Sequence, residues 1–120
     1  MLRLTALTLG LLLIGMVMGV DRAAGHHGWS GYNSEQTLNL SGTIQESGYE
    51  HPHGYVKLAV RDKVWLVVLA PPSRMENRGL PRNLLQAGTQ ASVVGYPSRS
   101  DSTEMRAERI TIDGKTVELR

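Results

Sequence analysis

Short segments in which apolar and polar residues alternate constrain this chain more than any other feature of its sequence. From residue 38 onward, stretches such as Val56-Lys57-Leu58-Ala59-Val60 place an apolar side chain at every second position. A period of two is typical of a β-strand that buries one face. Polar turns separate these stretches, and one of them, Asp113-Gly114, is a strong hairpin signal. The sequence therefore predicts a small, mainly β domain.

Six segments carry the strand pattern. They comprise residues 38–44, 55–60, 64–69, 90–96, 105–112 and 116–119. The second and third are predicted to form a hairpin, and the third, which is apolar at both parities, is predicted to be buried on both faces. In the fifth segment the apolar parity reverses between Ala107 and Ile110, which indicates a β-bulge near Glu108-Arg109.

A short helical insertion is predicted between the third and fourth strands. Pro71-Pro72 ends the third strand, and Ser73 with Glu76 three residues later forms a capping-box pattern. Three strands, a short helix, two strands and a terminal extension follow the order of an OB-type barrel. Closure into a barrel also removes exposed sheet edges. The expected fold class is therefore all-β, a small OB-like barrel of five to six strands; a small open β-sandwich or roll is the alternative.

The first 25 residues have the features of an export signal. A basic start is followed by an apolar run without charge, Leu4 to Val20, and Ala23 and Gly25 are the small residues that signal peptidase requires. The predicted domains are thus a signal peptide, 1–25, and an OB-like domain, 26–120, with an N-terminal histidine-containing arm. The predicted location is periplasmic or secreted, without a stable membrane span after cleavage. Because a run of about 17 residues is at the lower edge of spanning length, a retained anchor is the alternative.

Cysteine content and charge exclude several classes of function. The chain has no cysteine, so disulfides and thiolate metal sites are excluded. Its net charge is only +2 at pH 7, and glutamates are interleaved with the arginines of its second half. These arginines are Arg74, Arg78, Arg82, Arg99, Arg106 and Arg109. The interleaving favours paired surface charges over an anion or nucleic-acid site, so nucleic acid is not an expected partner.

All four histidines fall in two clusters, His26-His27 and His51-Pro52-His53. The second cluster lies between the first two predicted strands, in a loop that reaches the mouth of an OB barrel. Neutral imidazole is a good ligand for Cu(II), Ni(II) and Zn(II). The clustering therefore predicts a metal site formed by His26, His27, His51 and His53. Surface histidines that bind no metal are the alternative.

Cleavage after Gly25 would make His26 the first residue of the mature protein. Its amine and ring nitrogen, with a distant imidazole such as His53, would give three nitrogens in the T-shaped or square-planar set that suits Cu(II). Copper is therefore the expected metal. Zinc is the second choice, with Glu50 available as a carboxylate ligand.

The paired histidines before Trp29, the Leu40–Ile44 strand and the His51-Pro52-His53 motif together resemble an uncharacterised family of small exported bacterial domains. That family is described as a domain of unknown function. It has two histidines after the signal, then an aromatic residue, an L-x-G-x-V strand and an Asn-Pro-His motif. The resemblance implies export and a shared fold, with His26, His27 and His53 at the motif positions. This chain departs from it at His51, where the family has Asn.

These features predict a periplasmic metal-binding protein that handles or delivers copper. Its expected partners are the metal ion and a second periplasmic protein. No phosphate-binding loop, nucleophile elbow or pair of catalytic carboxylates is present, so a non-enzymatic role is favoured. One alternative is an OB-type interaction module that binds a protein, peptide or glycan. Another is a copper redox enzyme with an N-terminal histidine ligand.

We expect the exported protein to begin at His26. Ala23 and Gly25 satisfy the small-residue rule, whereas cleavage after Ala24 would place Arg22 at a disfavoured position. N-terminal sequencing of the protein recovered from the periplasm tests this expectation. A start at Met1, or beyond Trp29, would remove the proposed amine ligand.

Overall fold

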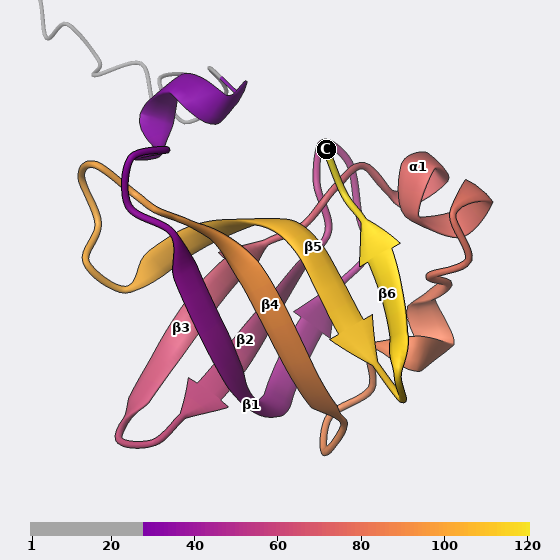
Figure 1. The fold of residues 1–120 in the computed structure, drawn as a ribbon. Helices are drawn as coiled ribbons and strands as arrows, with labels where there is room; N and C mark the ends of the chain where they lie inside the picture. The colour runs from indigo at the N-terminus through magenta and orange to yellow at the C-terminus, as the bar shows by residue number, and fades with distance from the viewer. Residues whose placement is uncertain (1–27) are drawn as a thin grey trace, which may run out of the picture.

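Six strands form one sheet that closes on itself (Figure 1). The computed structural model describes residues 28–120, so the predicted signal peptide and the arm residues His26 and His27 lie outside the described residues. The strands are β1 (Leu38–Gly48), β2 (Tyr55–Val60), β3 (Lys63–Val68), β4 (Gln90–Pro97), β5 (Glu104–Ile112) and β6 (Lys115–Glu118). Their order is β3-β2-β1-β4-β5-β6, and a parallel pairing of β3 with β5 closes a five-stranded barrel. The predicted OB-like barrel is confirmed.

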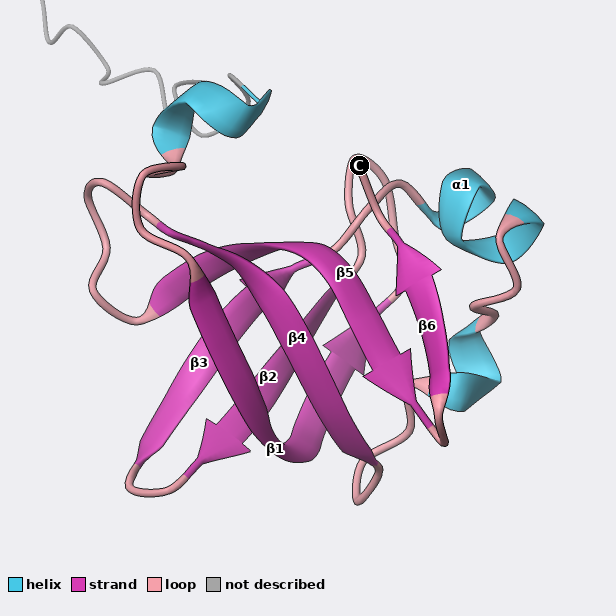
Figure 2. Ribbon diagram, viewed as in Figure 1, coloured by secondary structure: helices cyan, strands magenta, loops and turns pink. Residues whose placement is uncertain are grey.

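Short helical segments lie outside the barrel wall (Figure 2). The 3-10 helix η2 (Gly28–Gly31) precedes the first strand, and α1 (Pro72–Asn77) and the 3-10 helix η3 (Arg82–Leu84) lie between β3 and β4. The predicted insertion is therefore confirmed, but its predicted capping box is wrong. Pro71 is the N-cap and no side chain caps the helix. Pro72, in the first turn, starts the helix instead, since its fixed φ suits that position.

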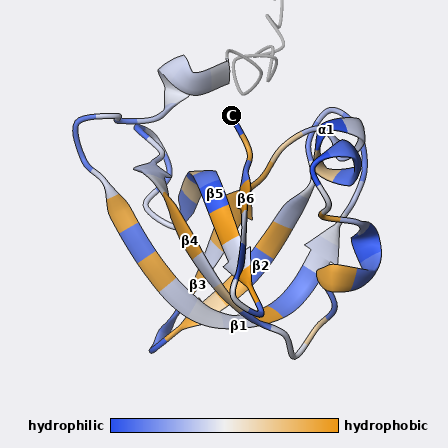
Figure 3. Cartoon of the chain, turned by 45° about the vertical axis from the view of Figure 1, so that its right-hand side comes forward, coloured by the Kyte–Doolittle hydropathy of each residue, from blue (hydrophilic) through white to orange (hydrophobic). Residues whose placement is uncertain are grey.

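The core fills the inside of the barrel. The alternation of hydrophobic and hydrophilic residues along the strands is visible in Figure 3. Each strand contributes an inward-facing side chain that is at most 3% exposed: Ile44, Leu58, Val67, Val93, Ile110 and Val117. Gly42 lets β1 approach β2, because a Cβ there would lie 2.0 Å from the Ala59 carbonyl oxygen. The period-two pattern of the sequence thus corresponds to the inner and outer faces of the barrel.

The predicted bulge in β5 is present. Val94 pairs with Arg109 and Gly95 with Ala107, so Glu108 is the extra residue. A bulge reverses which side chains face inward. Met105 and Ala107 therefore face the core before it and Ile110 and Ile112 face the core after it, while Arg106 remains on the outer face.

The structure corrects the prediction that the third strand is buried on both faces. Val67 is fully buried, but Val64, on the outer face, is 42% exposed. Leu66 and Val68, also on the outer face, are half-buried. The apolar residues at the far end of this outer face, Leu66 and Val68, line a hollow at the barrel mouth, which is described below.

Among residues 28–120, no helix has the length and apolar character needed to cross a membrane.

We expect Val67→Asp to lower the free energy of unfolding by roughly 3 kcal/mol or more, because it would place an unpaired charge inside the barrel. Val64→Asp is the matched control, since it makes the same change on the exposed face of the same strand. Urea denaturation followed by circular dichroism measures both. Equal stability of the two variants would contradict the assigned inner and outer faces.

Candidate functional site

The loop between β1 and β2 carries His51 and His53 to the mouth of the barrel. Two backbone hydrogen bonds fix its end: Gly54 N–H donates to the Ala70 carbonyl at 2.9 Å, and Leu69 N–H donates to the Gly54 carbonyl at 2.8 Å. The His51-Pro52 peptide bond is cis. His53 is half-buried beside this anchored residue, whereas His51 is exposed. The two histidines of the motif therefore lie in different environments.

His53 faces a hollow of about 240 Å³. Its walls come from the arm before β1, the His51–His53 loop, β2, β3 and β5. They consist of Tyr32, Pro52, His53, Gly54, Tyr55, Leu66, Val68 and Glu104. The Tyr32 hydroxyl donates a hydrogen bond to Glu104 Oε2 at 2.8 Å. Burial, followed by this bond to the carboxylate, raises the pKa of Tyr32, so the phenol remains protonated.

Arg106 is the buried charge at this mouth, with only 6% of its surface exposed. Its Nη2 lies 3.3 Å from His53 Nε2 and is hydrogen-bonded to it. Because a guanidinium only donates, Nε2 must accept, and the neutral ring carries its proton on Nδ1. Burial lowers the pKa of Arg106, and the nearby positive charges of Arg74 and Arg120 act in the same direction. Within residues 28–120, the buried Nε of Arg106 has no hydrogen-bond partner.

Trp29 attaches the arm to this site. The guanidinium carbons of Arg106 and Arg120 lie 4.3 and 4.6 Å from the centroid of its ring, which is the cation–π range. The ring also meets Tyr96 edge-on at a centroid distance of 6.1 Å. Arg106 therefore contacts Trp29 and His53 at the same time, and it links the arm to the β1–β2 loop.

Carboxylates beside Arg106 on β5 are engaged by tyrosines. Glu104 accepts the bond from Tyr32, and Glu108 accepts one from the Tyr96 hydroxyl. Glu108 is also 3.7 Å from Arg120. No ion pair joins Arg106 itself to a carboxylate in the described part of the chain.

The predicted metal ligands are only partly placed by the structure. His53 lines the hollow, His51 lies two residues away on the exposed part of the loop, and His26 and His27 are outside the described residues. Among residues 28–120, no group of three or more His, Cys, Asp or Glu side chains could hold a metal ion.

Sequence reasoning missed the role of three residues at this site: Tyr32, Glu104 and Arg106. Two signals were present. The apolar outer positions Leu66 and Val68 marked a covered part of the barrel surface, and the parity reversal near Glu108 implied that Arg106 faces outward. The burial of Arg106 depends on contacts with Trp29 and His53, 77 and 53 residues away, and no local pattern reports such contacts.

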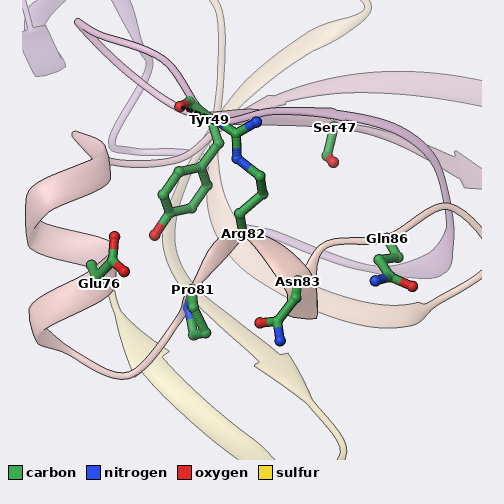
Figure 4. Close-up of a pocket in the computed structure, with 7 residues that line it drawn as sticks. All are labelled: Ser47, Tyr49, Glu76, Pro81, Arg82, Asn83 and Gln86. Carbon is green, nitrogen blue, oxygen red and sulfur yellow. Dashed lines mark hydrogen bonds between the residues drawn. The ribbon is translucent and has the colours of Figure 1, made fainter.

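A second hollow, of about 670 Å³, lies beside the helical insertion and contains no histidine (Figure 4). It is lined by Ser47, Tyr49, Glu76, Pro81, Arg82, Asn83 and Gln86. The Tyr49 hydroxyl donates to the Leu80 carbonyl at 2.6 Å, which fixes one wall. The Arg82 guanidinium lies 5.7 Å from the centroid of the Tyr49 ring.

The strand order and the contacts of Trp29 show that this chain is a small OB-like barrel with an N-terminal arm packed against its mouth. The chain belongs to DUF6152, a family of unknown function, whose family model matches residues 15–107. Comparison with curated proteins finds no matching sequence.

Solved structures of TiaS are similar to this chain. One is the ZRD-deleted mutant of TiaS in complex with agmatine, with 19% identity and a TM-score of 0.50 over 73% of this chain. Another is the complex of TiaS with an isoleucine tRNA and ATP, with 22% identity and a TM-score of 0.47 over 74% of this chain. The matches span 25% and 20% of those chains. At this identity the first shows the fold alone.

We expect the metal-free protein to hold His53 as the Nδ1–H tautomer, because Arg106 donates to Nε2. Nitrogen-15 NMR of the imidazole distinguishes the two tautomers. Arg106→Met should release the constraint and shift the His53 signals toward the Nε2–H form, while those of exposed His51 stay unchanged. An Nε2–H tautomer at His53 in the parent protein would contradict the hydrogen bond.

Proposed function

We propose that this protein binds copper at the mouth of its barrel and acts in periplasmic metal handling or delivery. The proposed ligands are nitrogens of His26, His27 and His53, with His51 as a further ligand from the same loop. One observation carries the proposal: Arg106 contacts both Trp29 and His53, so the described start of the arm lies beside the His53 imidazole.

Chain length supports this assignment. His26 and His27 precede Trp29 by three and two residues. Since an extended chain spans at most about 3.6 Å per residue, their backbones lie within about 11 Å and 7 Å of that of Trp29. The arm is held by more than one contact, because Asn33 N–H donates to the Pro97 carbonyl at 2.9 Å and Arg99 N–H to the Gly31 carbonyl at 3.0 Å. The described start of the arm is thus fixed against the barrel, which supports including the preceding histidines in the proposed site.

The donor set favours copper over zinc. A terminal amine and imidazoles suit the tetragonal geometry of Cu(II). Zinc sites more often recruit Cys or a carboxylate, and Glu104, the carboxylate in the hollow, is already engaged by Tyr32. Glu50, the loop carboxylate that the sequence suggests as a zinc ligand, is exposed.

The hydrogen bond between Arg106 and His53 supports a role in copper transfer over one in copper storage. The lone pair of His53 Nε2 accepts from Arg106, so a metal that uses this nitrogen must first displace the guanidinium. A positive charge close to the bound ion also weakens its binding. A site with a built-in competitor of this kind releases its metal more readily than a storage site does.

A one-residue extension tests the proposed site most sharply. Adding an alanine before His26 leaves every side chain intact but moves the amine off the chelate, so we expect Cu(II) affinity to fall at least about tenfold. His26→Ala and His53→Ala should each weaken binding similarly. Competition with a chromophoric chelator measures all three, and Lys57→Ala, on the exposed face of β2, is the control. If the extended protein and a variant carrying both His26→Ala and His53→Ala bind copper as the parent does, the proposed histidine site is wrong.

The hollow beside the helical insertion supports a second candidate function, an interaction module that binds a protein, peptide or glycan. Glu76, Asn83 and Gln86 line it, and their side chains have no hydrogen bond or ion pair within the described residues. Such a module would depend on Tyr49 and Arg82 and would be indifferent to the histidines. Ligand binding that survives His53→Ala but fails in Tyr49→Ala would therefore favour this function.

A further inference from the structure

Positive charge gathers at the mouth of the barrel from three separate elements. Arg74 comes from α1, Arg106 from β5 and Arg120 from the segment after β6. Arg106 and Arg120 both lie against the Trp29 ring. Arg74 Nη1 donates to the Leu119 carbonyl at 3.1 Å, beside Arg120. The charges of Arg74 and Arg120 both act on Arg106 and help to lower its pKa, after the larger effect of burial.

The cluster has few direct ion-pair partners. In the described part of the chain, Arg120 is the one member with a carboxylate within 4 Å, Glu108 at 3.7 Å. Glu104 and Glu108, two residues to either side of Arg106, accept hydrogen bonds from tyrosine hydroxyls; they keep their negative charge, but neither forms an ion pair with Arg106. A buried guanidinium without an ion-pair partner of its own is unfavourable.

The hydrogen-bonding capacity of Arg106 is also unmet. Its side chain is more than nine-tenths buried, and its Nε has no partner within residues 28–120. Its Nη2 donates to a neutral imidazole rather than to an anion. A desolvated, planar guanidinium that already stacks on an aromatic ring is the side chain best suited to hold a carboxylate or a phosphate through paired hydrogen bonds.

We propose that the mouth of the barrel is a binding site for a small oxyanion, a carboxylate or a phosphate, held by Arg106 with Arg74 and Arg120. The anion supplies the ion-pair partner that Arg106 and Arg74 lack within residues 28–120, and an acceptor stronger than the His53 ring. This site does not depend on copper. If copper does bind His53, the same anion offsets the charge between the metal and Arg106.

Glu104 and Glu108 limit what the site accepts. They flank Arg106 on β5, so negative charge borders the cluster along the strand. Both carboxylates would repel an extended polyanion along the strand, which disfavours it more strongly than a single small oxyanion held by the arginines. The chemistry therefore favours one small ligand over a nucleic-acid strand.

Titration of the metal-free protein, in the presence of a chelator, tests the proposal separately from copper binding. Inorganic phosphate and acetate are the two probes, each at constant ionic strength set with sodium chloride. We expect one probe or both to bind saturably at one site per chain, by calorimetry and by a rise in Tm. Arg106→Gln should weaken this binding at least about tenfold, and Arg74→Gln and Arg120→Gln should each weaken it as well.

Arg109→Gln is the matched control. Arg109 lies on the same strand, but its side chain is 40% exposed and paired with Glu118 at 2.9 Å, so its loss should leave the affinity unchanged. Because Arg106→Gln changes a buried residue, Arg120→Gln, on an exposed side chain, keeps the test valid if the first variant does not fold. Absence of saturable binding of both probes, or equal loss in Arg109→Gln and Arg120→Gln, would overturn the proposal.

Discussion

The parallel pairing of β3 with β5 is the interaction on which both the fold and the candidate site depend. It joins Leu66 to Glu104, Val67 to Met105 and Val68 to Arg106. The inner pair, Val67 and Met105, is fully buried and completes the core. The outer members line the hollow or contact His53. Closure of the barrel and assembly of its mouth are therefore one event, because the same three register positions do both.

Arg106 connects the two proposals made for that mouth. It donates to the His53 Nε2 lone pair, lies over the Trp29 ring of the arm and belongs to the arginine cluster for which an anion site is proposed. A cation bound at His53 and an anion bound at the arginines would attract each other. The anion would also offset the repulsion between the cation and the Arg106 guanidinium. Copper bound at His53 Nε2 would displace the guanidinium, and an oxyanion would give that guanidinium a new acceptor.

Local patterns in the sequence predicted most of the fold and part of the site. The alternation of apolar residues, the parity reversal in residues 105–112 and the Asp113-Gly114 turn each correspond to a strand, bulge or hairpin of the structure. Position in the first loop also predicted correctly that His53 lies at the mouth. The prediction that residues 64–69 are buried on both faces was wrong. The apolar residues on the outer face line a hollow and do not pack beneath a covering layer. The burial of Arg106 was beyond local patterns, since residues distant in sequence create it.

The extra residue at Glu108 has a consequence for how this family can tolerate insertions and deletions. Losing one residue from a regular strand turns every side chain on one side of the loss to the opposite face. Deleting Glu108 would not do so, because it is the extra residue: Ala107 and Arg109 would follow one another opposite Gly95 and Val94, and Met105, Ala107, Ile110 and Ile112 would still face the core. Its loss would instead remove the local bend and extra twist that a bulge gives a strand. Length variation should therefore be tolerated at this position as well as in the hairpin turns, such as Arg61-Asp62.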